Sequence, residues 1–474
     1  MISFKKNDFK KSMLFFWLTF AIVFSYVIID ISVNEVLLLL SLLILFFVLF
    51  FNFKNHYFSS YILISLGFLV PLLSRLVSGV IFGLFIDSLL VFMALSLFLD
   101  VKIKLDTKAI LTPLPIVLFL WFFFTLLELI NPLSTSKVSW FYANRAFSIY
   151  PFVIVLLTLH FFKHPKKLKP FLMIWGGLSI FGTLWGIKQL FFGVSALEQI
   201  WLDAGAAKSH VLFGKLRVFS FFTDAAQFGA SQAHAAIVFG LISLKEPSRR
   251  NKIIYWLVAL FGFYGMIISG TRGVLSIIFV GLFTYALLSK KLKTIVLVGV
   301  ILVTSLVFLK FTTFGNSNYQ MNRVRTALNF NDPSFMIRIN RIKELKTFMV
   351  GKPLGFGIGS GGYWANRFYP NGPQILKSAD SYYISLWMQT GIVGLLFKII
   401  LILFTIFYLG WLIINIKNDN HRQMAAAFFC AYCGYLVADF TNTLSIQLPS
   451  SVMLPMTLGL IYFLALQDKK EQIK

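Results

Sequence analysis

The side chains in this sequence that are best suited to bind or catalyse are basic ones that cluster between apolar stretches. Residues 312–380 hold nine basic side chains against three acidic ones: Arg323, Arg325, Arg338, Arg341, Lys343, Lys346, Lys352, Arg367 and Lys377 against Asp332, Glu344 and Asp380. A guanidinium presents several planar donors and does not deprotonate, so it suits phosphate or carboxylate groups. The segment therefore predicts an anionic ligand, and the alternative is a solvated basic surface.

An amphipathic helix is predicted over residues 334–350 of this segment. An Asp-Pro pair suits its start and Gly351 suits its end. Five apolar side chains recur on one stripe at helical spacing: Phe335, Ile339, Ile342, Leu345 and Met349. Arg338 falls within this stripe and Arg341 at its edge. An arginine that packs inward needs an anionic partner, and the alternative is an arginine that extends along the helix to water.

A run of glycines follows this helix directly: Gly355, Gly357, Gly359, Gly361 and Gly362. Such a run can bend backbone amides around a phosphate, so Gly355 and Gly357 are candidate substrate-binding residues. The run matches neither a dinucleotide fingerprint nor a P-loop, because no βαβ pattern precedes it and no Gly-Lys-Ser/Thr ends it. A flexible turn is the alternative.

Several charged residues lie inside apolar runs, where a charge is costly and points to function. They are Asp87, Glu128, Lys188, Asp224, Lys398 and Asp439. Asp224 lies near an outer face, seven residues after Arg217. Its carboxylate could pair with an arginine or position a hydroxyl, and a structural salt bridge is the alternative.

Metal and redox chemistry find little support in the residue spacing. Cys430 and Cys433 form a Cys-x-x-Cys pair within an apolar stretch, with no second pair and no nearby histidine, so both are expected to pack in the core. His210 could bind or catalyse on the outer side. No acidic cluster with the spacing of a metal site occurs on the outer side, and no metal is expected.

The elements that must position these residues are membrane helices. Of 474 residues, 58% are hydrophobic and 13% are charged, against about 25% charged in ordinary soluble domains. Fourteen apolar runs are long enough to span a bilayer, which excludes a soluble enzyme, a β-barrel and a disordered chain. The runs cover 13–29, 36–51, 58–74, 79–99, 110–130, 147–162, 171–192, 218–244, 253–269, 273–289, 294–311, 384–416, 423–442 and 447–466. The predicted fold class is an all-α polytopic membrane protein with about 12–14 transmembrane helices.

The net charge of +25 reflects the orientation of the protein in the membrane and does not indicate a nucleic-acid-binding site. Lysines and arginines cluster in alternate segments between the runs, as the positive-inside rule requires. Lys5, Lys6, Lys10 and Lys11 place the N-terminus in the cytoplasm. Fourteen crossings, an even number, place the C-terminus on the same side. Residues 1–311 are then transmembrane helices, 312–380 a periplasmic arginine-rich loop, and 381–474 C-terminal transmembrane helices.

Three segments together resemble the O-antigen ligase and Wzy-type polysaccharide polymerase superfamily. Ser269-Gly-Thr-Arg-Gly273 is similar to that family's Ser-x-Ser-Arg-Gly motif. Arg338, the helix after it and Lys352-Pro-Leu-Gly-Phe-Gly357 are similar to its arginine, amphipathic helix and Pro-Leu-x-Gly-x-Gly. Asp380-Ser-Tyr-Tyr-Ile-Ser-Leu386 with Gly391-Ile-Val-Gly394 is similar to its His-Asn-x-Tyr-Leu followed by Gly-Leu-x-Gly. The resemblance covers about 260–400, and 217–229 loosely. Ligases of the family carry a histidine where this chain has Asp380.

The resemblance implies a GT-C-like glycosyltransferase in the bacterial inner membrane that uses no metal or nucleotide cofactor. It implies an undecaprenyl-pyrophosphate-linked glycan donor and a glycan or lipid-linked acceptor, among membrane lipids and without nucleic acid. A chain-length regulator would be a further partner of a polymerase. The catalytic residues are then Asp380, Arg272 and Arg338. The substrate-binding residues are Arg217, Arg341, Asp224, Gly355, Gly357 and Tyr383. Asp380 would either accept the proton of the acceptor hydroxyl or orient that hydroxyl.

Two other classes of function remain open from the sequence. A transporter or flippase of polysaccharide or lipid-linked glycan would show internal repeats and helices broken at the bilayer midplane. No repeat of one half in the other is evident, and the arginines lie at an outer rim. A non-catalytic membrane scaffold would not need the arginine-rich loop.

Overall fold

The computed structural model describes residues 56–77, 80–99, 110–134, 136–162, 167–212, 214–312, 322–323, 325, 333–377 and 381–473. In this part the protein is built from helices, with one small antiparallel ribbon of β1 (Val211–Leu212) and β2 (Lys215–Leu216). The predicted all-α polytopic fold class is confirmed. The first two predicted runs, 13–29 and 36–51, lie outside the described residues.

The following helices correspond to the apolar runs predicted for the described ranges, except α7, which no predicted run covers and which extends the run 147–162 toward the N-terminus. They are α3 (His56–Leu76), α4 (Gly83–Leu99), α6 (Pro113–Leu127), α7 (Lys137–Asn144), α8 (Tyr150–Phe161), α9 (Leu168–Phe192), α12 (Ala225–Ser243), α13 (Arg249–Ile268), α14 (Leu275–Ser289), α15 (Leu292–Phe311), α20 (Tyr382–Asn415), α21 (Asp419–Ala438) and α22 (Ser450–Ile473). Within the described ranges, nine stretches are long and apolar enough to cross a membrane, with α7 and α8 continuous in one of them. Helices α4 and α14 are shorter apolar helices.

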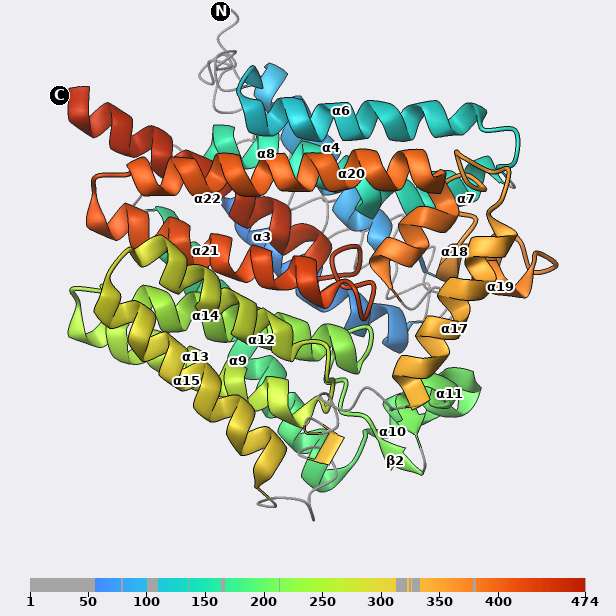
Figure 1. Ribbon diagram of the computed structural model, residues 1–474, viewed down its shortest axis with the longest axis horizontal. Helices are drawn as coiled ribbons and strands as arrows, with labels where there is room; N and C mark the ends of the chain where they lie inside the picture. Colours follow the sequence, from blue (N-terminus) through green and yellow to red (C-terminus); the bar gives the residue numbers. More distant parts are fainter. Residues whose placement is uncertain are drawn as a thin grey trace, which may run out of the picture.

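Short helices lie mostly in the outer segments. They are α10 (Ala196–Trp201), α11 (Ala207–His210), α17 (Pro333–Phe348), α18 (Gly362–Phe368) and α19 (Gln374–Lys377), with single turns η2 (Glu128–Ile130), η3 (Arg145–Ile149) and η5 (Leu202–Ala206). In Figure 1, α10, α11 and α17 to α19 gather at one end of the long helices, and the C-terminus lies at the other. We call these the outer and the inner end.

Contacts between distant segments agree with this division into two ends. At the inner end, the Lys245 ammonium lies 3.7 Å from the Asp419 carboxylate, and the backbone amide of Lys417 donates to Asp468 over 3.0 Å. All four residues belong to segments that the charge pattern assigns to the same side. The outer segments contact one another in the same way, as described below for the candidate site.

Helices α12 and α22 form the centre of the bundle. In the most apolar stretches of α12 and α22, 94% and 89% of the residues are buried, against 6% in that of α15. Small residues allow this close packing: a Cβ on Gly262 of α13 would lie 2.7 Å from the carbonyl oxygen of Gln232 in α12. Cys430 and Cys433 are free and buried in α21, as core packing predicts.

One predicted helix start is wrong in an informative way. The run 218–244 is helical only from Ala225, and residues 217–219 have no regular secondary structure. Phe219, Phe221 and Phe222 are nonetheless fully buried. Hydropathy reported the burial of this segment correctly, but a buried loop and a buried helix have the same hydropathy.

The long outer loop forms the predicted helix and then turns sharply against α20. Helix α17 buries Leu345 and Met349 against Met388 of α20, whereas Ile342 is 40% exposed, so the described part of the predicted stripe is fully buried only toward the C-terminal end of the helix. Within α20, Gly391 adopts φ +64° and ψ −170°. A Cβ there would overlap the carbonyl of Pro353, so this position requires glycine.

We expect the outer end to face the periplasm, because the charge alternation assigns it outside. A cysteine replacing Asn371, which is exposed at this end, should react with an impermeant thiol reagent in cells whose outer membrane has been permeabilised. The background lacks Cys430 and Cys433. Asn420→Cys, exposed at the inner end, is the control and should react only after the inner membrane is lysed. The reverse labelling pattern would show that the orientation is inverted.

Candidate functional site

The loop between α13 and α14 carries the first candidate arginine. Gly270 takes φ +58°, and the Ser269 hydroxyl accepts from the amide of Thr271 over 3.2 Å while donating to Met266. These bonds end α13 with a tight turn. Thr271 is buried, whereas Arg272 is half-buried, so the turn holds the guanidinium-bearing residue at the edge of the packed outer end.

Arg217 reaches this loop from the segment that precedes α12. Its Nη2 donates to the Thr271 hydroxyl over 3.4 Å, and its amide donates to the His210 carbonyl over 2.8 Å. The structure therefore brings Arg217, which matched the family pattern only loosely, beside the loop that carries Arg272. Two basic residues from separate segments flank Thr271.

Asp224 lies at the start of α12, close to the same loop. Its carboxylate caps the helix by accepting from the Gln227 amide over 2.9 Å. A Cβ on Gly229 of α12 would clash with the Ser269 side chain, so the first turns of α12 pack directly on the loop. Capping gives Asp224 a structural role, and binding of substrate by it stays a prediction.

The start of α20 is tied to the end of α21. The Tyr382 amide and the Ser381 hydroxyl both donate to the Asp439 carbonyl, over 3.0 and 3.2 Å. The Tyr383 hydroxyl donates to the Leu436 carbonyl over 2.9 Å. Asp380 itself lies outside the described residues, but the residue that follows it is fixed against α21.

The loop between α21 and α22 joins these segments. A Cβ on Gly273 would lie 2.8 Å from the Thr441 Cβ and 3.2 Å from the side-chain nitrogen Nδ2 of Asn442. Farther along, Gln447 accepts from the Thr223 hydroxyl over 3.0 Å. The loop thus contacts the segments before α12 and before α14, and Asp439 connects it to the start of α20. Sequence reasoning assigned it no role.

The motif that contains Arg338 occupies α17 and the glycine run. Arg338 belongs to α17, with its side chain outside the described part, and Arg341 is half-buried. Gly355 and Gly357 take φ +70° and +82°, which glycine adopts without strain. The run packs between α20 and the segment before α7: a Cβ on Gly357 would lie 2.8 Å from the Ser134 Cβ. Substrate binding by the two glycines stays a prediction.

Hydrogen bonds account for part of the glycine run. The Gly355 amide donates to the Lys352 carbonyl over 3.1 Å, the Phe356 amide to Met388 over 3.0 Å, and the Gly359 amide to the Gln389 side chain over 2.6 Å. These amides are engaged within the protein, so their bonds support the packing role of the turn.

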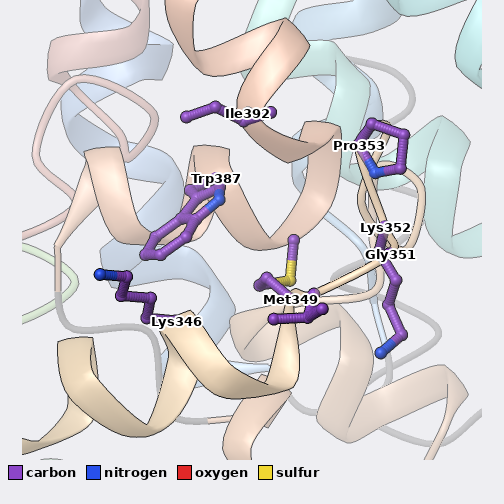
Figure 2. A pocket seen from close by; sticks show the side chains of 8 residues that line it. Lys346, Met349, Gly351, Lys352, Pro353, Trp387 and Ile392 are labelled. Atoms are coloured by element: carbon purple, nitrogen blue, oxygen red, sulfur yellow. The ribbon is translucent and has the colours of Figure 1, made fainter.

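An open groove of about 340 Å³ lies beside this motif (Figure 2). It is lined by Lys346, Met349, Val350, Gly351, Lys352, Pro353, Trp387 and Ile392. The indole ring of Trp387 lies between Lys346 and Ile392 in the view. The outer part of α20 therefore presents an apolar surface next to positive charge.

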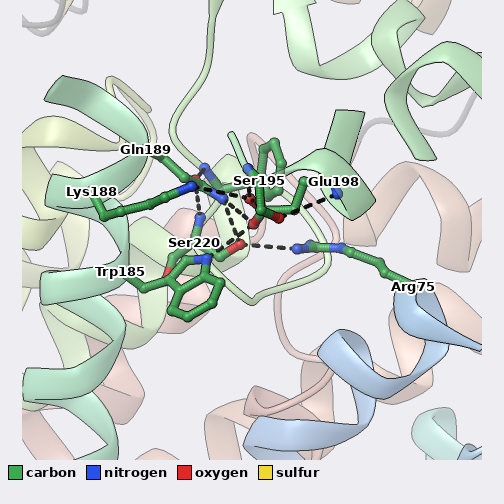
Figure 3. Close-up of polar contacts among 8 residues, drawn as sticks. Arg75, Trp185, Lys188, Gln189, Ser195, Glu198 and Ser220 are labelled. Atoms are coloured by element: carbon green, nitrogen blue, oxygen red, sulfur yellow. Dashed lines mark hydrogen bonds and ion pairs between the residues drawn. The ribbon is translucent and has the colours of Figure 1, made fainter. Parts of the chain in front are cut away.

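A polar cluster holds the segment that carries Arg217 (Figure 3). The Arg75 guanidinium lies 4.6 Å from the ring centroids of Trp201 and Phe219, and its Nη1 donates to the Ser220 carbonyl over 2.9 Å. Gln189 accepts from the Ser220 amide over 2.7 Å and donates to its carbonyl over 3.0 Å. These bonds fix Ser220 at φ +52°, a conformation that L residues seldom adopt.

Glu198 completes this cluster as an ionised carboxylate. Burial raises its pKa, but hydrogen bonds from Ser195, Trp185 and Gln189 outweigh burial and hold the pKa below its ordinary value. Lys188 lies 3.9 Å away. The cluster thus supports the segment that carries Arg217 and Ser220, and Lys188 balances the negative charge of Glu198.

His210 lies between two carbonyl groups at the outer end. Its Nδ1 is 2.9 Å from the Ala206 carbonyl oxygen and its Nε2 is 3.2 Å from that of Thr223. Burial lowers its pKa, against the opposing effect of these carbonyls. The ring is buried and fastens the segment before Asp224, so its contacts are those of a structural residue.

Across the described ranges, one group of His, Cys or acidic side chains is close enough to share a metal ion: His421, Asp468 and Glu471. It lies at the inner end, away from the arginine-bearing loops. The Asp468 carboxylate there already accepts from the amides of Lys417 and Asn418.

Comparison with known protein families gives one match. Residues 257–399 match the sequence model of the O-antigen ligase family. The matched segment begins in α13 and ends within α20, and it contains all three predicted motifs. The predicted resemblance is thereby confirmed over this part of the chain. No curated protein matches the sequence significantly.

The contact between Gly273 and Thr441 can be tested by a pair of substitutions. Gly273→Ala should lower the melting temperature, because the new Cβ meets the Thr441 side chain. Thr441→Gly should cost less by itself and should restore much of the loss in the double variant. A coupling energy of about 0.5–3 kcal/mol is expected for residues in contact, measured by thermal unfolding in detergent. Strictly additive effects would show that the two loops do not touch.

Proposed function

From the O-antigen ligase domain at 257–399, we propose that this membrane protein is a glycosyltransferase that polymerises or ligates surface polysaccharide. Its donor would be a glycan linked to undecaprenyl pyrophosphate, and transfer would occur on the periplasmic face of the bacterial inner membrane. The product would be O-antigen, capsule or exopolysaccharide. The observation that supports this best is that the Arg217 and Arg272 segments contact each other and that the loop after α21 connects them to the start of α20, at one end of the bundle.

The arginines would stabilise the leaving group. As the bond between the anomeric carbon and the diphosphate oxygen breaks, negative charge develops on the diphosphate. Arg272 and Arg338 would hold this charge with fixed, planar donors, and Arg217 and Arg341 would help to bind the diphosphate. Donors that are already in place need no rearrangement during the reaction.

The acceptor sugar would supply the nucleophile. Its hydroxyl oxygen forms the new bond to the anomeric carbon from the side opposite the diphosphate, which inverts that centre. The hydroxyl proton passes to the carboxylate of Asp380 if Asp380 acts as the base. Asp380 directly precedes Ser381, whose position against Asp439 is fixed. Tyr383 and Asp224 would contact the sugars.

Arg272→Ala should lower glycan assembly by about 10²–10³-fold, the usual effect of removing one preorganised donor. Arg272→Lys should recover little, because an ammonium lacks the bidentate geometry of a guanidinium. Arg338 should behave alike. The measurement is gel analysis of surface polysaccharide in cells lacking their own copy of the gene, at matched protein abundance. Arg249→Ala, exposed at the inner end, is the control and should remain active.

A purified system separates this mechanism from metal catalysis. Transfer that stops in EDTA and resumes on addition of a divalent ion would contradict the role of the arginines. Full activity of Arg272→Ala would contradict it as well.

Asp380→Asn separates the roles proposed for this residue. If Asp380 takes the proton, the amide should abolish transfer and Asp380→His should retain part of it, because the related ligases carry histidine at this position. If Asp380 only orients the acceptor, the Asn variant should keep much of the rate. The assay is extension of a lipid-linked repeat, and near-normal turnover by Asp380→Asn would remove the base role.

A further inference from the structure

We propose that Asp439 is a positioning residue for this reaction: it holds the loop after α21 and the start of α20 in register with the loop that carries Arg272. The inference rests on the proposed function for its effect on turnover. Its structural part is independent, because it concerns contacts that exist whether or not the protein transfers sugars. Asp439 lies beyond the segment that matches the family.

The carboxylate of Asp439 organises the turn that follows it. Its Oδ1 accepts from the amides of Leu444 and Ser445 over 2.9 and 3.1 Å, and its Oδ2 accepts from the Ser445 hydroxyl. The side chain is 1% exposed. Three donors converge on one buried carboxylate, which compensates for the loss of water around it.

The main chain of Asp439 holds a second segment. Its carbonyl accepts from the Tyr382 amide and from the Ser381 hydroxyl. These are the first two residues after Asp380 in the sequence, so Asp439 fixes the segment that directly follows the proposed base.

The turn held by Asp439 reaches the arginine-bearing loops. Thr441 and Asn442 pack on Gly273, the residue after Arg272. Gln447 accepts from Thr223 and, through its carbonyl, from the Gln227 side chain over 3.3 Å. Asp439 is therefore connected, directly or through residues 440–447, to the start of α20, to the loop that carries Arg272 and to the start of α12.

From this arrangement we expect that replacing the Asp439 carboxylate disturbs the geometry of the proposed site more than the stability of the fold. In Asp439→Asn, the amide keeps the shape, but only its oxygen can accept, so the three donors that the two carboxylate oxygens now hold cannot all keep a partner. A displacement of about 1 Å at a reacting centre can cost about 10²-fold in rate. Asp439→Asn should thus lower glycan assembly by about that factor at matched protein abundance.

Asp468 provides a matched control at the inner end. Its carboxylate also accepts from two loop amides, those of Lys417 and Asn418, over 3.0 and 2.7 Å, and from one side chain, that of Gln472. Asp468→Asn removes the same kind of support far from the proposed site. It should lower the melting temperature by a similar amount and leave glycan assembly unchanged.

A second readout does not depend on activity. Leu444 is 1% exposed, and its amide is held by Asp439. Leu444→Cys, in a background lacking Cys430 and Cys433, should react slowly with a thiol reagent. Adding Asp439→Asn should raise that rate at least tenfold, because the turn that buries residue 444 loses part of its support from Asp439. A tenfold change corresponds to about 1.4 kcal/mol in the free energy of opening this turn. Adding Asp468→Asn should leave it unchanged.

The two readouts give distinguishable outcomes. Faster labelling together with reduced glycan supports the positioning role. Unchanged labelling in Asp439→Asn overturns it, whatever happens to glycan. Equal loss of glycan in the Asp439 and Asp468 variants also overturns it, because the effect would then be general destabilisation. If a cell lacking the gene makes normal glycan, the proposed function fails, while the labelling still tests the contacts.

Discussion

The structure depends on one constraint: backbone groups freed from a helix near a membrane must find partners within the protein. At the outer end of this bundle, side chains from neighbouring helices supply those partners. Asp439 accepts from the amides at 444 and 445, Gln389 from Gly359, and Gln189 from Ser220. Each polar side chain fixes one irregular segment, so the helices can end in loops of defined shape.

The candidate site follows from this support. Arg217 and Arg272 belong to loops, and neighbouring helices hold these loops in place. Arg217 lies on the segment that Arg75 and Gln189 hold, and Arg272 lies on the turn that packs against Thr441. The positive charge at the outer end is therefore attached to a rigid base, which preorganised stabilisation of a diphosphate would require.

The family match and the tertiary structure define different parts of the site. The match covers 257–399 and includes Arg272, Arg338 and Asp380. The contacts extend it to the start of α12 and to residues 441–447, because these segments pack on the Arg272 loop and on one another. Residues outside a family's motif can be needed for the motif's geometry, and here they come from both sides of it along the chain.

The sequence by itself determined the apolar helices of the described ranges, because hydropathy acts locally along the chain. The side of the membrane that each end faces stays a prediction from the charge pattern. The sequence also predicted α17 within about two residues. Hydropathy reports burial but not conformation or partner, so it misread 218–224 as helix and did not foresee the break at Gly391. Asp439 was visible as a costly intramembrane charge. Only the tertiary structure decided that its main-chain carbonyl accepts from the start of α20, because Ser381 lies 58 positions away along the chain and no local pattern encodes such a pairing.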